Sequence, residues 1–185
     1  LAETLKSEYP KFNFVPIYWM ATEDHDFEEV NHVNLFGKKL EWKQEQKGGV
    51  GAIPTETLKS IFEELKPILG DSKEADELYS LFSEAYLEHK DLATATRYLV
   101  NALFAKYGLL ILDADDTRLK QEAISLIKKD ILEQSNQSLI DASNKGLGKV
   151  LAFVRPINFF YLQKGSRNRI EQEASHFIVL GTDLK

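Results

Sequence analysis

The sequence predicts an α/β fold in which a parallel sheet forms the core, helices are inserted between its strands, and an antiparallel hairpin lies at the edge. Two short apolar runs, residues 14–21 and 109–112, are rich in β-branched and aromatic side chains, which is typical of buried strands. Amphipathic helical patterns separate the two runs, and this order favours parallel pairing. Residues 167–180 alternate between polar and apolar side chains, as a hairpin does.

Composition sets the outer limits of the function. The chain has 185 residues, enough for a proper core, and we expect residues 1–185 to form one partial α/β domain. Its 23 basic and 29 acidic residues give a net charge of −6, which argues against a nucleic-acid partner. The absence of cysteine excludes disulfides and thiolate metal sites and favours a cytoplasmic location. No apolar stretch approaches membrane-spanning length, so we expect no membrane partner.

The strongest functional signal follows the first predicted strand. Seven of the ten residues 23–32 are acidic or histidine, and ligands of open α/β sheets collect beyond the carboxyl ends of the strands. If this segment is a helix capped by Thr22, four of these side chains form one stripe along it. They are His25, Glu28, Glu29 and His32. Imidazole titrates near neutral pH and a neighbouring carboxylate can orient it, so the stripe suits proton transfer.

The middle of the chain is predicted to be a helical insertion at about residues 55–107. Apolar side chains at helical spacing predict helices over 58–69, 78–85 and 92–103, the first of them disturbed at Pro67. Gly108 stands where a helix-ending glycine is expected. The glycine-rich segment 47–51 lacks the ending of a P-loop and the spacing of a dinucleotide fingerprint, so we interpret it as a flexible connection.

A second acidic cluster follows the second predicted strand. Asp113, Asp115 and Asp116 come directly after residues 109–112. One interpretation is helix capping by Asp115 or Asp116 ahead of a helix that begins at Thr117. If the two strands are neighbours, both acidic clusters line one crevice. Such a crevice would attract ammonium groups or a divalent cation rather than phosphate, and would suit a substrate with free amines.

The C-terminal part carries fewer chemical signals. A helix is predicted from Thr117 to Glu133, then a polar loop to residue 148 and a strand over 149–162 that Pro156 interrupts. Arg155 could hold a carboxylate or phosphate with both arms of its guanidinium, although an ordinary surface ion pair is also open. The sequence has no serine or cysteine elbow of the hydrolase type, so acyl transfer through such a nucleophile is not expected.

Two other interpretations of segment 23–32 stay open. Its carboxylates could complement a helix dipole on a solvated face, as in a non-catalytic α/β binding module. Alternatively, His25, Glu28 and His32 could hold a metal ion and an activated water, as in a metal-dependent hydrolase. The i, i+7 spacing of the histidines is wider than the i, i+4 pair of a zinc-protease helix, and we predict no metal site.

Several segments together resemble a known family, the bacillithiol biosynthesis cysteine-adding enzymes, which are regarded as the cysteine ligases of that pathway. They occur in the family's order and comprise residues 19–32, 103–116, 155–162, 165–170 and 179–184. The first segment, from Trp19 to His32, is the most specific, whereas the glycine-rich segment and the helices carry little. The resemblance covers almost the whole chain.

The resemblance implies a Rossmann-like core with inserted helical segments, related to nucleotidyltransferase and aminoacyl-synthetase folds. It implies that cysteine is joined to the amine of glucosaminyl-malate in the last step of bacillithiol synthesis. Forming an amide from a free carboxylate needs activation, so ATP or another nucleotide is the implied cofactor. The implied partners are the small-molecule substrates cysteine and glucosaminyl-malate, and a second copy of the chain through a coiled-coil region outside residues 1–185.

The resemblance also assigns residues to a site. The core motif would line the active cleft with the catalytic residues Asp24, His25, Asp26, Glu28, Asn31 and His32. The substrate-binding residues would be Asp113, Asp115, Arg155, Asn158 and Tyr161. The chain departs from the family at residues 151–154 and at Pro156, next to Arg155. We expect both ends to be truncated relative to the family, and the piece alone to be inactive.

Overall fold

A computed structural model describes residues 1–45, 48–133, 136–145, 155–163 and 165–184. The chain forms two compact units, Leu1–Asp115 and Asp116–Lys185, each of which is considered by itself. Both units contain helices and strands, so the mixed α/β class predicted from the sequence is confirmed. The extent of a single domain over residues 1–185 stays a prediction.

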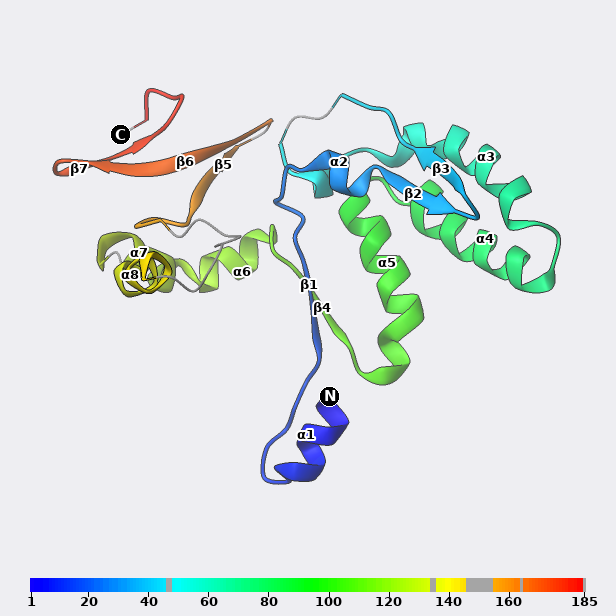
Figure 1. The fold of residues 1–185 in the computed structure, drawn as a ribbon, viewed down its shortest axis with the longest axis horizontal. Coiled ribbons are helices and arrows are strands. Elements are labelled where there is room, and N and C mark those ends of the chain that lie inside the picture. The colour runs from blue at the N-terminus through cyan, green and yellow to red at the C-terminus, as the bar shows by residue number, and fades with distance from the viewer. Residues whose placement is uncertain (46–47, 134–135, 146–154, 164, 185) are drawn as a thin grey trace. The chain divides into compact units, whose positions relative to one another are not determined.

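The first unit contains the predicted parallel pair of strands. Strand β1 (Ile17–Met20) lies beside β4 (Leu110–Asp113), with Ile17 opposite Leu110 and Met20 opposite Asp113 (Figure 1). The expectation that both strands are buried is wrong. Ile17, Trp19 and Leu110 are more than half exposed, and in β1 only Met20 is buried. The cause is that β1 and β4 form a two-stranded sheet in the described part of the chain, so few side chains cover them.

The helices of the insertion lie between β3 and β4 in the chain, as their sequence periodicity predicts. They are η1 (Val50–Ala52), η2 (Thr55–Leu58), α3 (Lys59–Leu69), α4 (Lys73–Leu87), α5 (Leu92–Phe104) and η3 (Ala105–Tyr107). The Ser72 and Asp91 side chains cap α4 and α5 by accepting backbone N–H groups of Ala75 and Thr94. Gly108 follows with φ +74, as expected for a glycine that ends a helical segment.

A hairpin replaces much of the helix predicted after Thr22. Only α2 (Phe27–Val30) is helical there, and β2 (His32–Leu35) then pairs with β3 (Lys38–Glu41). The turn between them has φ +48 at Phe36 and φ +79 at Gly37, the left-handed conformations of a tight hairpin turn. The backbone N–H of Trp42 also donates to the carbonyl of Asn31 (2.6 Å), which extends the pairing past β3. Strand pairing therefore prevents the predicted helix from continuing.

The core of the first unit lies between this hairpin and the inserted helices (Figure 1). Its buried side chains are Leu40, Trp42, Val50, Ile53, Leu58, Phe62 and Leu65. Trp42 donates its indole N–H to Thr57 of η2 (2.8 Å), so its polar atom is satisfied. Phe27 meets the Trp42 ring edge-on at 5.3 Å and attaches α2 to this core. The short helix α1 (Ala2–Glu8) has no buried residue.

The second unit combines three short helices with an antiparallel sheet. The helices are α6 (Thr117–Glu122), α7 (Ile124–Glu133) and α8 (Gln137–Asn144). The strands are β5 (Phe160–Gln163), β6 (Ser166–Glu173) and β7 (His176–Val179), in the order β5-β6-β7. The predicted hairpin is thus confirmed, within a sheet of its own. The helix predicted over 117–133 divides at Ala123, and the early part of the strand predicted over 149–162 lies outside the described residues.

Within the described residues, no helix is both long and apolar enough to cross a membrane.

Candidate active site

The two acidic segments meet at the carboxyl ends of β1 and β4. Thr22, two residues after the end of β1, is 7 % exposed and donates its hydroxyl to Asp113 Oδ1 at the end of β4. The backbone N–H of Asp115 donates to the same Asp113 oxygen (3.0 Å) and to the Thr22 hydroxyl oxygen (3.3 Å). The predicted neighbourhood of the two strand ends is therefore present. The buried Thr22 links the two strand ends by hydrogen bonds, and it does not cap a helix as the sequence suggested.

His25 lies between two carboxylates in the loop that follows Thr22. Its Nδ1 is 3.3 Å from Asp24 Oδ1, and its Nε2 is 3.6 Å from Asp26 Oδ1. The His25 backbone N–H also donates to Asp24 Oδ1 (2.7 Å), which holds the Asp24 side chain against the imidazole. About half of each of the three side chains is exposed. A solvent-accessible imidazole with a carboxylate near each nitrogen is suited to accept a proton from a bound substrate.

His32 does not share a stripe with His25, because it belongs to strand β2 and not to a helix. Its Nδ1 is 3.0 Å from Asn31 Oδ1, and in the hairpin it stands opposite Glu41. Lys39 donates a hydrogen bond to Glu41 (2.6 Å) and, with its charge, keeps the pKa of that carboxyl below its usual value. Glu28 lies on the exposed side of α2. The single helical stripe predicted to join His25 and His32 through Glu28 is therefore wrong, although Glu28 itself is helical.

The metal interpretation loses its geometric basis as well. In the part of the chain that the structure describes, the only group of potential metal-binding side chains is Asp24, His25 and Asp26, whose nearest ligand atoms lie within 4.8 Å of one another. The set His25, Glu28 and His32 is not among such groups. Adjacent exposed acids are common without a bound metal ion, so this cluster by itself does not indicate a metal site.

The glycine-rich segment is a packed support of the site, although the sequence suggested a flexible connection. The backbone N–H groups of Val50 and Gly51 donate to the carbonyls of Asp24 (2.6 Å) and Thr22 (2.9 Å). A Cβ atom at Gly51 would lie 2.5 Å from Thr22 Cβ, and one at Gly49 would lie 2.8 Å from the Thr22 carbonyl oxygen. Only glycine permits this approach, which fixes the backbone that carries His25. Lys47 lies outside the described residues.

Two further residues of the site were missed from the sequence. Arg97 of α5 approaches Asp113 with Nη2 at 3.7 Å from Oδ2 and donates from Nη1 to the carbonyl of Ile111 (3.3 Å). Glu23 has a buried carboxylate oxygen, Oε2, with no hydrogen-bond partner among the described residues. The acidic end of β4 is a weak signal that a cation should be nearby, but nothing in the sequence around Arg97 identifies that cation.

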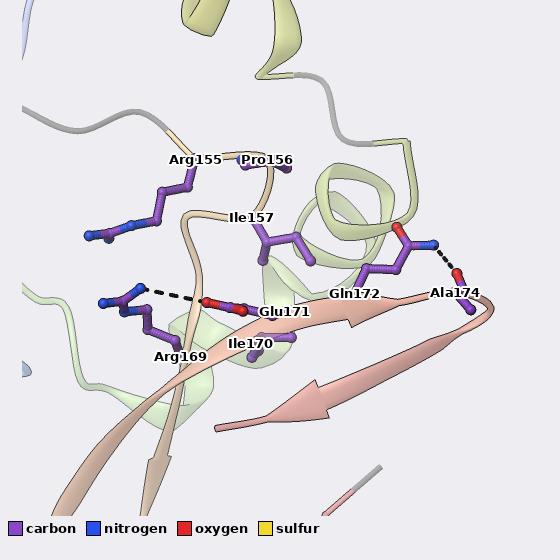
Figure 2. Close-up of a pocket in the computed structure, with 8 residues that line it drawn as sticks. All are labelled: Arg155, Pro156, Ile157, Arg169, Ile170, Glu171, Gln172 and Ala174. Carbon is purple, nitrogen blue, oxygen red and sulfur yellow. Dashed lines mark hydrogen bonds and ion pairs between the residues drawn. The ribbon is translucent and has the colours of Figure 1, made fainter. Parts of the chain in front are cut away.

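The other expected substrate-binding residues belong to the second unit. Arg155 donates its backbone N–H to Asn158 Oδ1 (3.2 Å), so these two residues are brought together. Tyr161 lies on β5 opposite Asn168 and is 38 % exposed. Arg155 lines a pocket of about 480 Å³ with residues of β6 (Figure 2). The residues 151–154 that depart from the resemblance lie outside the described residues.

Comparison with known proteins identifies the chain. Residues 1–185 match the family Bacillithiol biosynthesis BshC, N-terminal Rossmann-like domain. The chain belongs to this family. It is 47 % identical over 184 residues to a protein of Flavobacterium psychrophilum and 44 % identical over 186 residues to one of Flavobacterium johnsoniae. These alignments cover 98 % and 100 % of the chain, and a Staphylococcus haemolyticus protein is 26 % identical over 205 residues, covering 100 % of it.

All three relatives carry the name "Putative cysteine ligase BshC". The chain spans about a third of their length, namely 35 %, 35 % and 37 %. The resemblance seen in the sequence and the Rossmann-like fold are thereby confirmed. A Rossmann-like domain is compatible with nucleotide binding at the carboxyl ends of its strands. In this BshC domain, however, the ends of β1 and β4 carry Asp24, Asp26, Asp113 and Asp115, which suit ammonium groups better than phosphates.

Proposed function

We propose that this BshC domain is part of a ligase that joins the carboxyl group of cysteine to the amine of glucosaminyl-malate, the last step of bacillithiol synthesis. Family membership supports the reaction class, and the relatives' names refer to a cysteine ligase. The observation that carries the site is His25, half exposed and held between Asp24 and Asp26 just beyond the end of β1. A base placed in this way is what an amine nucleophile requires.

The amine of the acceptor is mostly protonated at neutral pH and must lose a proton before or during attack. Its nitrogen forms a bond to the activated carboxyl carbon of cysteine, the bond from that carbon to the leaving oxygen breaks, and the nitrogen's proton passes to the His25 imidazole. Asp24 and Asp26 orient the imidazole and stabilise the imidazolium that results. When bound, ATP or another nucleotide would supply the activation of the cysteine carboxylate; no described residue is assigned to its phosphates.

The remaining predicted residues complete the site in this proposal. Asp113 is the last residue of β4 and Asp115 lies just beyond it, both beside Thr22, where their charge suits an ammonium group of cysteine or of the amino sugar. Glu28, Asn31 and His32 stay predicted catalytic residues, and the Asn31 amide oxygen lies 3.0 Å from His32 Nδ1. Asn158 and Tyr161, with Arg155, stay predicted binders of the substrate. Substitution of these three residues should raise the KM for the substrate without abolishing the reaction that depends on His25.

The decisive experiment uses the complete natural protein. Cysteine, glucosaminyl-malate and ATP are supplied, and the cysteinyl product is quantified by mass spectrometry for the wild type and for His25→Ala and Asp26→Ala. Loss of a general base typically lowers a rate by about 10²- to 10⁴-fold, and we expect a loss of this size for His25→Ala. His176→Ala is the matched control, because His176 is an exposed histidine on β7. Full activity of His25→Ala would contradict the catalytic assignment.

Three further features belong to the same proposal. We expect residues 1–185 alone to give no product, because the chain spans about a third of its relatives' length. We also expect the complete protein to be a homodimer through a coiled-coil region outside these residues, which light scattering would measure. The proposed use of ATP and cysteine places the reaction in the cytoplasm, and fluorescence microscopy of a tagged complete protein checks the location.

A further inference from the structure

The second unit contains a pocket in which Arg155, named above only as a predicted substrate binder, lies beside residues of β6. It lies between the loop that begins at Arg155 and strand β6, and its volume is about 480 Å³ (Figure 2). This volume lies within the range of small-molecule sites. The lining residues are Arg155, Pro156, Ile157, Arg169, Ile170, Glu171, Gln172 and Ala174. All belong to one unit, so the pocket does not depend on how the two units are arranged.

Positive charge predominates in this pocket. Figure 2 shows the guanidinium groups of Arg155 and Arg169 extending toward the same side of it. Arg169 Nη1 lies 3.5 Å from Glu171 Oε1, and both side chains are about half exposed. No acidic side chain of the described residues forms an ion pair with Arg155, which leaves two guanidinium groups and one carboxylate. An anion bound between the arginines would relieve their mutual repulsion.

The apolar side chains of the pocket and its one carboxylate limit what kind of anion can bind there. Ile157 is 6 % exposed and, with Ile170 of β6, gives the pocket an apolar surface suited to a carbon chain. The contact of the Arg155 N–H with Asn158 fixes the loop that carries Arg155. The Glu171 carboxylate would repel a polyphosphate with its many charges more than it would repel a carboxylic acid. The pocket therefore fits a small molecule with one or two carboxylates.

We propose that Arg155 and Arg169 form a binding site for a small dicarboxylate. Each guanidinium can bind one carboxylate with two parallel hydrogen bonds. The inference builds on the proposed function, whose amine substrate carries a malate group with two carboxylates. It assigns recognition of that group to this pocket and adds Arg169 as a specificity-determining residue.

Binding of malate to the complete natural protein tests this site without any turnover. Isothermal titration calorimetry is performed with malate, and with ATP and inorganic phosphate as competing probes, for the wild type, Arg155→Gln and Arg169→Gln. Losing one charged pair should weaken malate binding about tenfold or more in each variant. Arg118→Gln is the control, because Arg118 is an exposed arginine of α6 in the same unit that pairs with Asp116 at 2.6 Å. Its malate affinity should change less than about twofold.

The outcomes separate this site from the proposed reaction. In a turnover assay, Arg169→Gln should raise the KM for glucosaminyl-malate and leave the KM for cysteine unchanged. His25→Ala should lose turnover and still bind malate. If the wild type binds no malate, or if both arginine variants bind it normally, the pocket proposal is overturned while the ligase proposal stands. Displacement of malate by ATP or phosphate at similar concentrations would show an anion site of another class and would equally overturn it.

Discussion

Thr22 and His25 belong to one short loop, yet their surroundings are opposite. Thr22 is 7 % exposed and bonds to Asp113, Asp115 and, through its carbonyl, Gly51. The His25 side chain is 52 % exposed and contacts the carboxylates of its two sequence neighbours. Buried bonds thus hold the loop in place, while the group suited to proton transfer stays open to a substrate. Different residues therefore support the site and carry its chemistry, and they should respond differently to substitution.

Among the residues that hold the loop in place, Gly51 is expected to give the largest loss of stability when it is substituted. A Cβ there would lie 2.5 Å from Thr22 Cβ, so Gly51→Val forces the loop and the strand end apart. Overpacking of this kind typically costs about 1–3 kcal/mol, and chemical denaturation should show a loss in that range. Ala52→Val is the control, because Ala52 is the exposed neighbour of Gly51 in η1. An equal loss at Ala52 would show that the contact with Thr22 is not the cause, and the packed-support description would be wrong.

A smaller loss of stability is expected when only the Thr22 hydroxyl is removed. Thr22→Val keeps the volume but deprives the Asp113 carboxylate and the Asp115 N–H of a partner, which typically costs about 1–2 kcal/mol. His25→Ala should change the free energy of unfolding by less than about 0.5 kcal/mol, because it is a surface substitution. Thermal denaturation of both variants makes the comparison. If His25→Ala were the more destabilising of the two, the division between support and chemistry would fail.

The smallest expected effect is a change in the pKa of Glu41, in the hairpin that carries His32. Lys39 lowers the pKa of Glu41, first by its hydrogen bond and then by its charge. A carboxyl whose folded pKa is depressed adds stability above its unfolded pKa, near 4.5, and loses it as the pH falls through the folded value. Lys39→Gln should therefore move the Glu41 pKa up toward 4.5, as an NMR titration of its carboxyl carbon would show. Lys38→Gln, one residue away, should leave that pKa where it is.

Much of the fold could be predicted because its signals are local. The run 14–21, the apolar positions of α3 and α5, and Gly108 act through neighbouring residues, and each gave an element of the expected type. The helix after Thr22 was wrong because His25, Glu28 and His32 fit a helical stripe by spacing alone. The competing signal, a turn at Phe36–Gly37 followed by a pairing strand, depends on residues outside that segment.

The site was predicted where sequence neighbours form it and missed where distant residues do. His25 and its two carboxylates are consecutive, so their cluster could be anticipated. Gly51 and Arg97 act on Thr22 and Asp113 from other elements, and their roles depend on contacts that no spacing reveals. The pocket of Arg155 and Arg169 likewise requires the register of β6 beside the preceding loop.

The bond between Thr22 and Asp113 also has a consequence for how the chain acquires its site. These residues are 91 positions apart, and parallel pairing of β1 with β4 closes the loop that contains every inserted helix. Loop-closure entropy makes such distant pairings slow compared with helix formation. We therefore expect α3, α4 and α5 to acquire protection from hydrogen exchange before β1 and β4 do. The loop that carries His25 would then reach its working position among the last parts of the molecule to fold, so a chain arrested early would have helices but no active site.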